Sequence, residues 1–113
     1  MHKPNVIKPT VGRKVWYRPS KADQLGPIPM SVSTGQPLDA TVVAVWGDRM
    51  VNVLVLDTYG KPFSKASVTL KQAGDEKAKD ADGNEIGGYV EWMPYQQNQA
   101  AKELAAEEST TTG

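Results

Sequence analysis

The sequence predicts a mainly β protein: a small five-stranded SH3-like barrel with a C-terminal helix. In residues 38–57, two runs rich in valine and leucine flank the polar break 47–49, which is the pattern of a β-hairpin. Apolar residues occupy both parities of these runs, so both faces of the hairpin need cover, which favours a barrel or a sheet with another segment laid across it. Residues 95–108 then combine strong helix formers with no glycine or proline.

Five segments carry strand patterns. The expected strands span residues 11–17, 39–46, 50–56, 66–72 and 87–93. Successive side chains of a strand alternate between its faces, so Tyr17 points inward and Trp16 outward. By the same alternation Trp92 points inward and Tyr89 outward. The fourth strand alternates most regularly, with Ala66 on its inner face.

The connections differ in length and in their expected role. Residues 18–37 are rich in proline and glycine and too long for an ordinary hairpin loop, so we expect them to be functional or partly mobile. Apolar residues of this loop are expected to anchor it across an open end of the barrel: Leu25, Ile28, Met30 and Val32. Residues 57–60 form a turn in which Gly60 takes a positive φ.

The expected core combines apolar side chains from all five strands. It consists of Val11, Val15, Val43, Val45, Val51, Val53, Val55, Val68, Leu70, Val90 and Trp92. Burial of each large side chain stabilises the fold by roughly 1.5–3 kcal/mol. Chain entropy offsets most of that sum.

The chain has 113 residues, which is enough for one domain and too few for two. We divide it into an extended N-terminal segment, 1–10, the barrel domain, 11–94, and a helix with a frayed tail, 95–113. There is no cysteine, which excludes disulfides and thiolate metal sites. No apolar run is long enough to span a membrane and no signal core is present, so we expect a cytoplasmic protein.

Three segments resemble small tailed-bacteriophage accessory proteins of unassigned function. They are VGRKVWY at 11–17, ATVVAVWGDRMVNVLVLDTYG at 40–60 and GGYVEWMP at 87–94. The matching residues are Gly12, Arg13, Trp16, Tyr17, Asn52, Asp57, Gly60, Trp92 and Pro94. The resemblance implies a phage accessory protein that acts in the host cell cytoplasm or in the virion, and it implies no particular chemistry.

Catalytic and metal-binding patterns are weak. The only histidine, His2, stands at the N-terminus, where packing cannot hold it as a catalytic base. Asp80, Asp82, Asn84 and Glu91 follow the spacing of an EF-hand, but Glu85 stands where that loop requires glycine. We therefore predict that the protein is not an enzyme and that it uses no metal and no cofactor.

Charge is balanced overall but unevenly distributed. The chain carries 13 basic and 13 acidic residues, and residues 1–22 contain six bases and no acid. Either this basic end packs near the acidic remainder, or Arg13, Lys14 and Arg18 form a phosphate or anion contact. A neutral domain is not typical of nucleic-acid binding, so we do not expect a nucleic-acid partner.

Outward aromatic residues are the best functional indication. Trp16, Trp46 and Tyr89 fall on the parity opposite to the expected core, and Tyr59 lies in a turn. Exposed apolar patches mark interaction sites, and Trp, Tyr and Arg dominate interface hot spots. The candidate partner-binding residues are therefore Trp16, Arg18, Trp46, Tyr59 and Tyr89. The terminal helix, the long loop, another copy of the chain or a partner would cover them.

Three functions stay open at this point. The leading hypothesis is a non-enzymatic, phage-encoded binding module that docks on a host or virion protein. The second is a counter-defence protein that sequesters a host signalling nucleotide. The third is a structural virion subunit, such as a capsid decoration or connector, which would form homo-oligomers.

Overall fold

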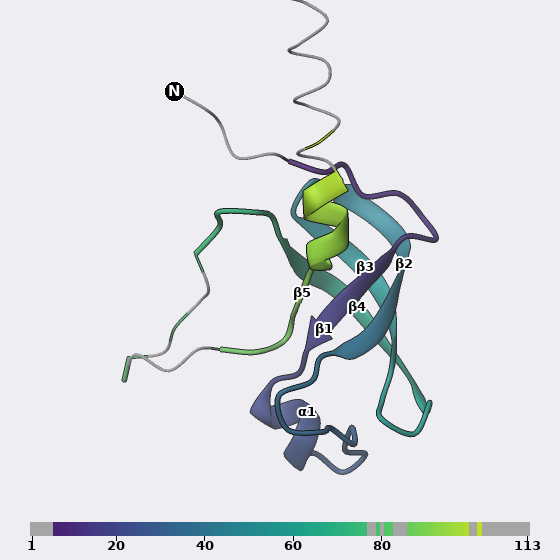
Figure 1. Ribbon diagram of the computed structural model, residues 1–113. Coiled ribbons are helices and arrows are strands. Elements are labelled where there is room, and N and C mark those ends of the chain that lie inside the picture. Colours follow the sequence, from purple (N-terminus) through teal and green to yellow (C-terminus); the bar gives the residue numbers. More distant parts are fainter. Residues whose placement is uncertain (1–5, 77–78, 80, 83–85, 100–101, 103–113) are drawn as a thin grey trace, which may run out of the picture.

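The computed structural model describes residues 6–76, 79, 81–82, 86–99 and 102, and these form a closed five-stranded barrel (Figure 1). The strands are β1 (Lys14–Arg18), β2 (Leu38–Gly47), β3 (Met50–Leu56), β4 (Pro62–Lys71) and β5 (Tyr89–Glu91). Consecutive strands pair antiparallel from β1 to β4, whereas β5 pairs parallel with β4 and antiparallel with β1. A helix over 94–99 follows β5. The predicted fold class is confirmed.

The observed strand bounds depart from the predicted ones mostly at the ends. The bounds of β3 coincide with the prediction, since its alternation is unbroken. Strand β1 begins three residues later than predicted, and Val11, which precedes it, is 69% exposed instead of belonging to the core. The C-terminal helix begins at Pro94, a residue that the first turn of a helix accepts. The remainder of the predicted helix, apart from residue 102, lies outside the described residues.

Two β-bulges in β2 correct its predicted inner face. The register against β3 shifts between Val42 and Ala44 and again between Val45 and Gly47. Val43 is the extra residue of the first bulge and is 49% exposed, so it does not belong to the core as predicted. Val45 was also predicted as core but remains exposed near the end of the strand. A bulge inserts one residue and reverses the alternation that follows it.

The observed core is otherwise close to the predicted one. Eight predicted core residues are buried: Val15, Val51, Val53, Val55, Val68, Leu70, Val90 and Trp92. Five further apolar residues join them: Tyr17, Met30, Leu38, Ala40 and Val42. The inner face of β2 therefore comes from even-numbered positions before the first bulge, and not from Val43 and Val45 as predicted.

A third bulge lies in β4, directly beside β3. Two residues of β4, Ala66 and Ser67, oppose the single residue Asn52 of β3. Ser67 takes a left-handed conformation with φ of 52°, which a residue with a side chain rarely adopts. Ala66 was predicted to point inward and is exposed instead. The bulge reverses the alternation, so that Lys65 lies opposite buried Val53 on the inner side of the sheet.

The long loop contains a short helix that the sequence analysis did not predict. Helix α1 (Lys21–Leu25) begins with a capping box in which the Ser20 hydroxyl accepts from the amide of Asp23 and the Asp23 carboxylate accepts from the amide of Ser20. Met30 is buried and anchors the loop as expected, whereas Leu25 and Ile28 are exposed. Figure 1 shows α1 at one end of the barrel and the described N-terminal segment at the other.

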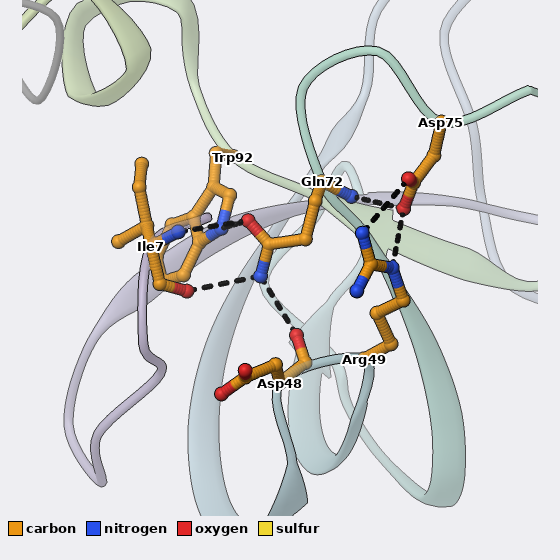
Figure 2. Close-up of polar contacts among 6 residues, drawn as sticks. All are labelled: Ile7, Asp48, Arg49, Gln72, Asp75 and Trp92. Carbon is orange, nitrogen blue, oxygen red and sulfur yellow. Dashed lines mark hydrogen bonds and ion pairs between the residues drawn. The ribbon is translucent and has the colours of Figure 1, made fainter. Parts of the chain in front are cut away.

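A buried glutamine closes the end of the barrel near the N-terminal segment (Figure 2). The Gln72 Oε1 accepts from the amide of Ile7 and from the Trp92 indole, both at 3.0 Å. Its Nε2 donates to the carbonyls of Ile7 at 2.9 Å and Asp48 at 2.7 Å. All four hydrogen bonds that this primary amide can form are made. One side chain therefore joins four segments of the chain.

A buried carboxylate joins α1 to the barrel at the other end. Asp23 accepts from the Tyr17 hydroxyl at 2.5 Å and from Lys65 Nζ at 2.6 Å. Burial opposes ionisation of Asp23, but hydrogen bonds from Lys65, Tyr17 and the Ser20 amide outweigh it and lower the pKa of the carboxyl. Burial and the hydrogen bond to Asp23 raise the pKa of Tyr17. This carboxylate thus stays ionised and fixes the long loop.

Within the described residues, no helix has the length and apolar character that crossing a membrane requires.

Candidate protein-binding surfaces

The outer face of β1, β5 and β4 brings together three of the five candidate partner-binding residues. Trp16 lies opposite Glu91 and Arg18 lies opposite Tyr89 in the register of β1 with β5. Strand β4 pairs with the other edge of β5, where Thr69 lies opposite Tyr89 and Lys71 lies opposite Glu91. We call this surface the mixed face and define it as Trp16, Arg18, Thr69, Lys71, Tyr89 and Glu91. Its residues come from three strands that are remote in sequence.

The side chains of the mixed face hold one another in place. The guanidinium of Arg18 lies 5.6 Å from the centre of the Trp16 ring, a cation–π distance. Its Nε and Nη2 both lie 3.1 Å from Oε1 of Glu91. Both partners of this ion pair are partly shielded from water. The tryptophan, the arginine and the glutamate therefore form one ordered unit on rigid strands.

A hollow of about 280 Å³ adjoins the mixed face. Its lining consists of Thr69, Lys71, Asp75, Glu76, Ile86, Gly87, Gly88 and Tyr89. The Gly88 amide donates to the carbonyl of Arg18 at 2.6 Å, which holds this wall against the end of β1. Gly87 packs so closely that a Cβ atom there would lie 2.1 Å from the Pro19 carbonyl oxygen. Glycine at this position allows the contact.

A second surface surrounds Trp46 on the outer side of β2 and β3. Trp46 is the extra residue of the second bulge of β2 and is 64% exposed. Its indole nitrogen donates to Oδ1 of Asn52 at 2.9 Å, and the amide of Ser67 donates to the same oxygen at 2.7 Å. Met50 and Leu54 flank Asn52 on the same side of β3 and are exposed. The exposed indole is thus fixed to the sheet.

The strand positions around Trp46 carry no outward charge, and the nearest charged residues, Asp48 and Arg49, lie in the adjoining turn. Residues 40–47 and 50–56 contain no charged side chain, and residues 62–70 contain only Lys65, which reaches inward to Asp23. We call this surface the neutral face and define it as Thr41, Val43, Ala44, Trp46, Met50, Asn52, Leu54, Ser64 and Ser67. The Lys14–Asp39 ion pair, at 3.1 Å, borders it, since Lys14 lies opposite Thr41.

Tyr59 belongs to neither face. It lies in the turn between β3 and β4, at the opposite end of β3 from Trp46, and is 86% exposed. The turn is ordered by Asp57, whose carboxylate accepts from the amides of Lys61, Tyr59 and Ser31. These hydrogen bonds, that of Lys61 foremost, lower the pKa of Asp57. Gly60 takes the predicted positive φ, at 81°.

The three candidate anion-binding residues do not converge on one point. Lys14 pairs with Asp39, and Arg18 pairs with Glu91. The guanidinium of Arg13 lies 5.9 Å from the ring of Trp92. A phosphate at Lys14 or Arg18 would compete with a carboxylate that is already in place.

Among the described residues, no group of three or more acidic or histidine side chains is placed to hold a metal ion. Three residues of the EF-hand spacing, Asp80, Asn84 and Glu85, lie outside the described residues, as does His2.

Sequence reasoning missed the structural roles of two polar residues, Asn52 beneath Trp46 and Asp23 in the long loop. Asn52 lies between a bulge of β2 and a bulge of β4, and bulges leave no clear signal in the sequence. Asp23 could have been found, because a serine followed three residues later by an acid is a helix-start pattern. Ser20 and Asp23 have this spacing.

No protein-family model, no curated protein and no solved structure matches this chain. The function of the chain is therefore inferred from the geometry of these surfaces.

Proposed function

We propose that this chain is a non-enzymatic binding module that docks on another protein through the mixed face. The observation that carries the proposal is the meeting of Trp16, Arg18 and Tyr89 at neighbouring strand positions beside a hollow. Tryptophan, tyrosine and arginine are the residues most enriched among interface hot spots.

The side chains of the mixed face are already held in place, which supports this role. Arg18 lies over Trp16 and pairs with Glu91, so these side chains lose little freedom when a partner binds. Side chains that are already ordered reduce the entropy cost of association. Arg18 and Glu91 also present both signs of charge, which orients a partner by electrostatic complementarity.

The pairing of the basic residues favours a protein over a nucleotide as the ligand. The hollow, at about 280 Å³, is close to the lower end of the volumes that small-molecule sites usually enclose, about 300–1,000 Å³. It suits a single side chain of a docked partner. The dispersed, already paired positions of Lys14 and Arg18 also give less support to nucleotide sequestration.

The resemblance of residues 11–94 to small phage accessory proteins supports a host or virion protein as the partner. Binding would act by stoichiometric occlusion, in which the module covers a functional surface of its partner. Tyr89 and Trp16 would supply apolar contact, and Arg18 would fix the orientation.

Quantitative affinity capture from bacterial lysate tests the proposal. The bait is the full chain as wild type, as the double variant Trp16→Ala, Arg18→Ala, or as the control Tyr59→Ala. We expect the wild type and the control to enrich the same partner. The double variant should bind it at least about 30-fold more weakly, which corresponds to a hot-spot loss of about 2 kcal/mol.

Two results would contradict the proposal. One is equal enrichment of that partner by the double variant, with circular dichroism showing that all three proteins are folded. The other is the absence of any partner that the wild type enriches over an unrelated barrel.

A further inference from the structure

The neutral face is unusual in a chain of this composition. Charged residues make up 23% of the sequence, yet none points outward from residues 40–47, 50–56 and 62–70, the strand positions around Asn52. The core of a protein interface is depleted of charge and enriched in tryptophan and methionine. Trp46 and Met50 stand here on the surface. The composition of this face is that of an interface core.

The backbone around Asn52 is arranged to hold Trp46. Bulges on both neighbouring strands lie opposite this residue, and a bulge re-aims the side chains it carries. Ser67 keeps a left-handed conformation and donates its amide to Asn52 Oδ1, the atom that also accepts from Trp46. Strain of this kind persists where surrounding structure enforces it, and it often marks a functional site.

From these features we infer that the neutral face joins two copies of this chain in a homodimer, with Trp46 as its anchor. A neutral surface meets its own copy without any contact between like charges. The bordering Lys14–Asp39 pair fits a two-fold axis, because the lysine of each copy can approach the aspartate of the other. A strongly charged partner would find no counter-charge within this face.

The contact would be face to face and not by strand addition. The barrel is closed, so the described strands leave no open edge for a strand of another chain. The mixed face centres on β1 and β5, whereas the neutral face centres on β2 and β3. The dimer would therefore present two mixed faces, and a bivalent partner would gain avidity. The inference itself does not depend on the proposed function.

Sedimentation equilibrium over a wide range of concentrations tests the inference on the full chain. We expect the wild type to approach twice the chain mass of 12.3 kDa. The variant Trp46→Glu should be monomeric at concentrations where the wild type is dimeric. Its dimer dissociation constant should be at least about 30-fold higher than that of the wild type. The control Tyr95→Glu, which places the same charge at another exposed aromatic residue, should remain dimeric.

A second variant keeps the test decisive if Trp46→Glu does not fold. Met50→Lys places a charge on the same face and should also be monomeric, with an unchanged circular dichroism spectrum.

A monomeric wild type at all concentrations would overturn the inference, as would dimeric Trp46→Glu and Met50→Lys. If the wild type is monomeric and captures another protein only when Trp46 is present, the neutral face binds that protein and the inference of a homodimer is wrong. The double variant Trp16→Ala, Arg18→Ala should keep the dimer, so the two proposals can fail separately.

Discussion

The Tyr17 hydroxyl donates a hydrogen bond of 2.5 Å to the carboxylate of Asp23, and this bond attaches α1 to the first strand of the barrel. Lys65 reaches the same carboxylate from the inner side of β4. Three segments that are separate in sequence thus share one buried anion. The long loop is ordered by this cluster together with the burial of Met30.

The stability supplied by Asp23 should depend on pH. Its folded-state pKa is lowered, so its contribution is fully present above the unfolded-state value of about 3.9 and is lost as the pH falls through the folded value. We expect Asp23→Asn to reduce the free energy of unfolding at pH 7 by about 1–3 kcal/mol. Urea unfolding should show that the difference in free energy of unfolding between the wild type and Asp23→Asn shrinks as the pH falls below about 3.9. The exposed control Asp48→Asn should change stability little, and an equal loss in both variants would contradict the assignment.

The four hydrogen bonds of Gln72 predict a large loss when its side chain becomes apolar. Gln72→Leu would leave the indole of Trp92, both backbone groups of Ile7 and the carbonyl of Asp48 without this partner. Each buried polar group without a partner costs about 1–3 kcal/mol, and we expect a total of about 3 kcal/mol or more. Chemical denaturation measures the loss.

The control for this prediction is Gln24→Leu. Gln24 is exposed and makes a single hydrogen bond within its own helix segment, to the Ser20 carbonyl. A surface change of this kind usually stays within about 0.5 kcal/mol. Similar losses for both glutamine variants would show that burial of Gln72 is not what matters.

The approach of Gly87 to Pro19 predicts that even a methyl group is harmful there. Gly87→Ala must displace backbone, since the added Cβ would lie 2.1 Å from the Pro19 carbonyl oxygen. We expect a loss of about 1–3 kcal/mol, the usual effect of overpacking. In Gly47→Ala the added atom meets nothing within 4 Å, so stability should change far less. Thermal unfolding of both variants compares them, and equal melting temperatures would contradict the close packing.

The left-handed conformation of Ser67 predicts a stabilising substitution to glycine. Relief of this conformation is worth about 1–2 kcal/mol, and the flexibility of glycine offsets about 0.5–1 kcal/mol of it. We therefore expect Ser67→Gly to raise the free energy of unfolding by roughly 0.5 kcal/mol. Ser64→Gly, in the same strand at an ordinary φ, should lower it. Urea unfolding measures both changes. A higher free energy of unfolding for Ser67→Gly and a lower one for Ser64→Gly would support the left-handed conformation of Ser67, and a lower value for both variants would count against it.

Alternation predicted the strands well where it was unbroken, and poorly where bulges interrupt it. In β3 the pattern gave correct bounds and correct faces. In β2 apolar residues occupy both parities, so nothing in the sequence shows where Val43 is inserted. The short helix α1 was missed because proline and glycine dominate the loop around it. Its capping residues Ser20 and Asp23 were the available signal.

The candidate surfaces were predictable in part. Parity placed Trp16 and Tyr89 outward, as the structure does. Their meeting, and the pairing of Arg18 with Glu91 across 73 positions of sequence, depends on how the barrel closes. The role of Asn52 depends on bulges in two other strands. Such contacts follow from strand register, which local pattern does not determine.

The tie between Ile7 and Gln72 has a consequence for assembly. Domain swapping requires a terminal arm that can leave its own fold and be replaced by the same arm of a neighbour. Withdrawal of the segment around Ile7 would leave a buried amide without two of its partners. The same arm of a neighbour would remake these bonds, so the tie slows the exchange of arms, and we expect copies that meet as folded barrels to retain their own N-terminal arms.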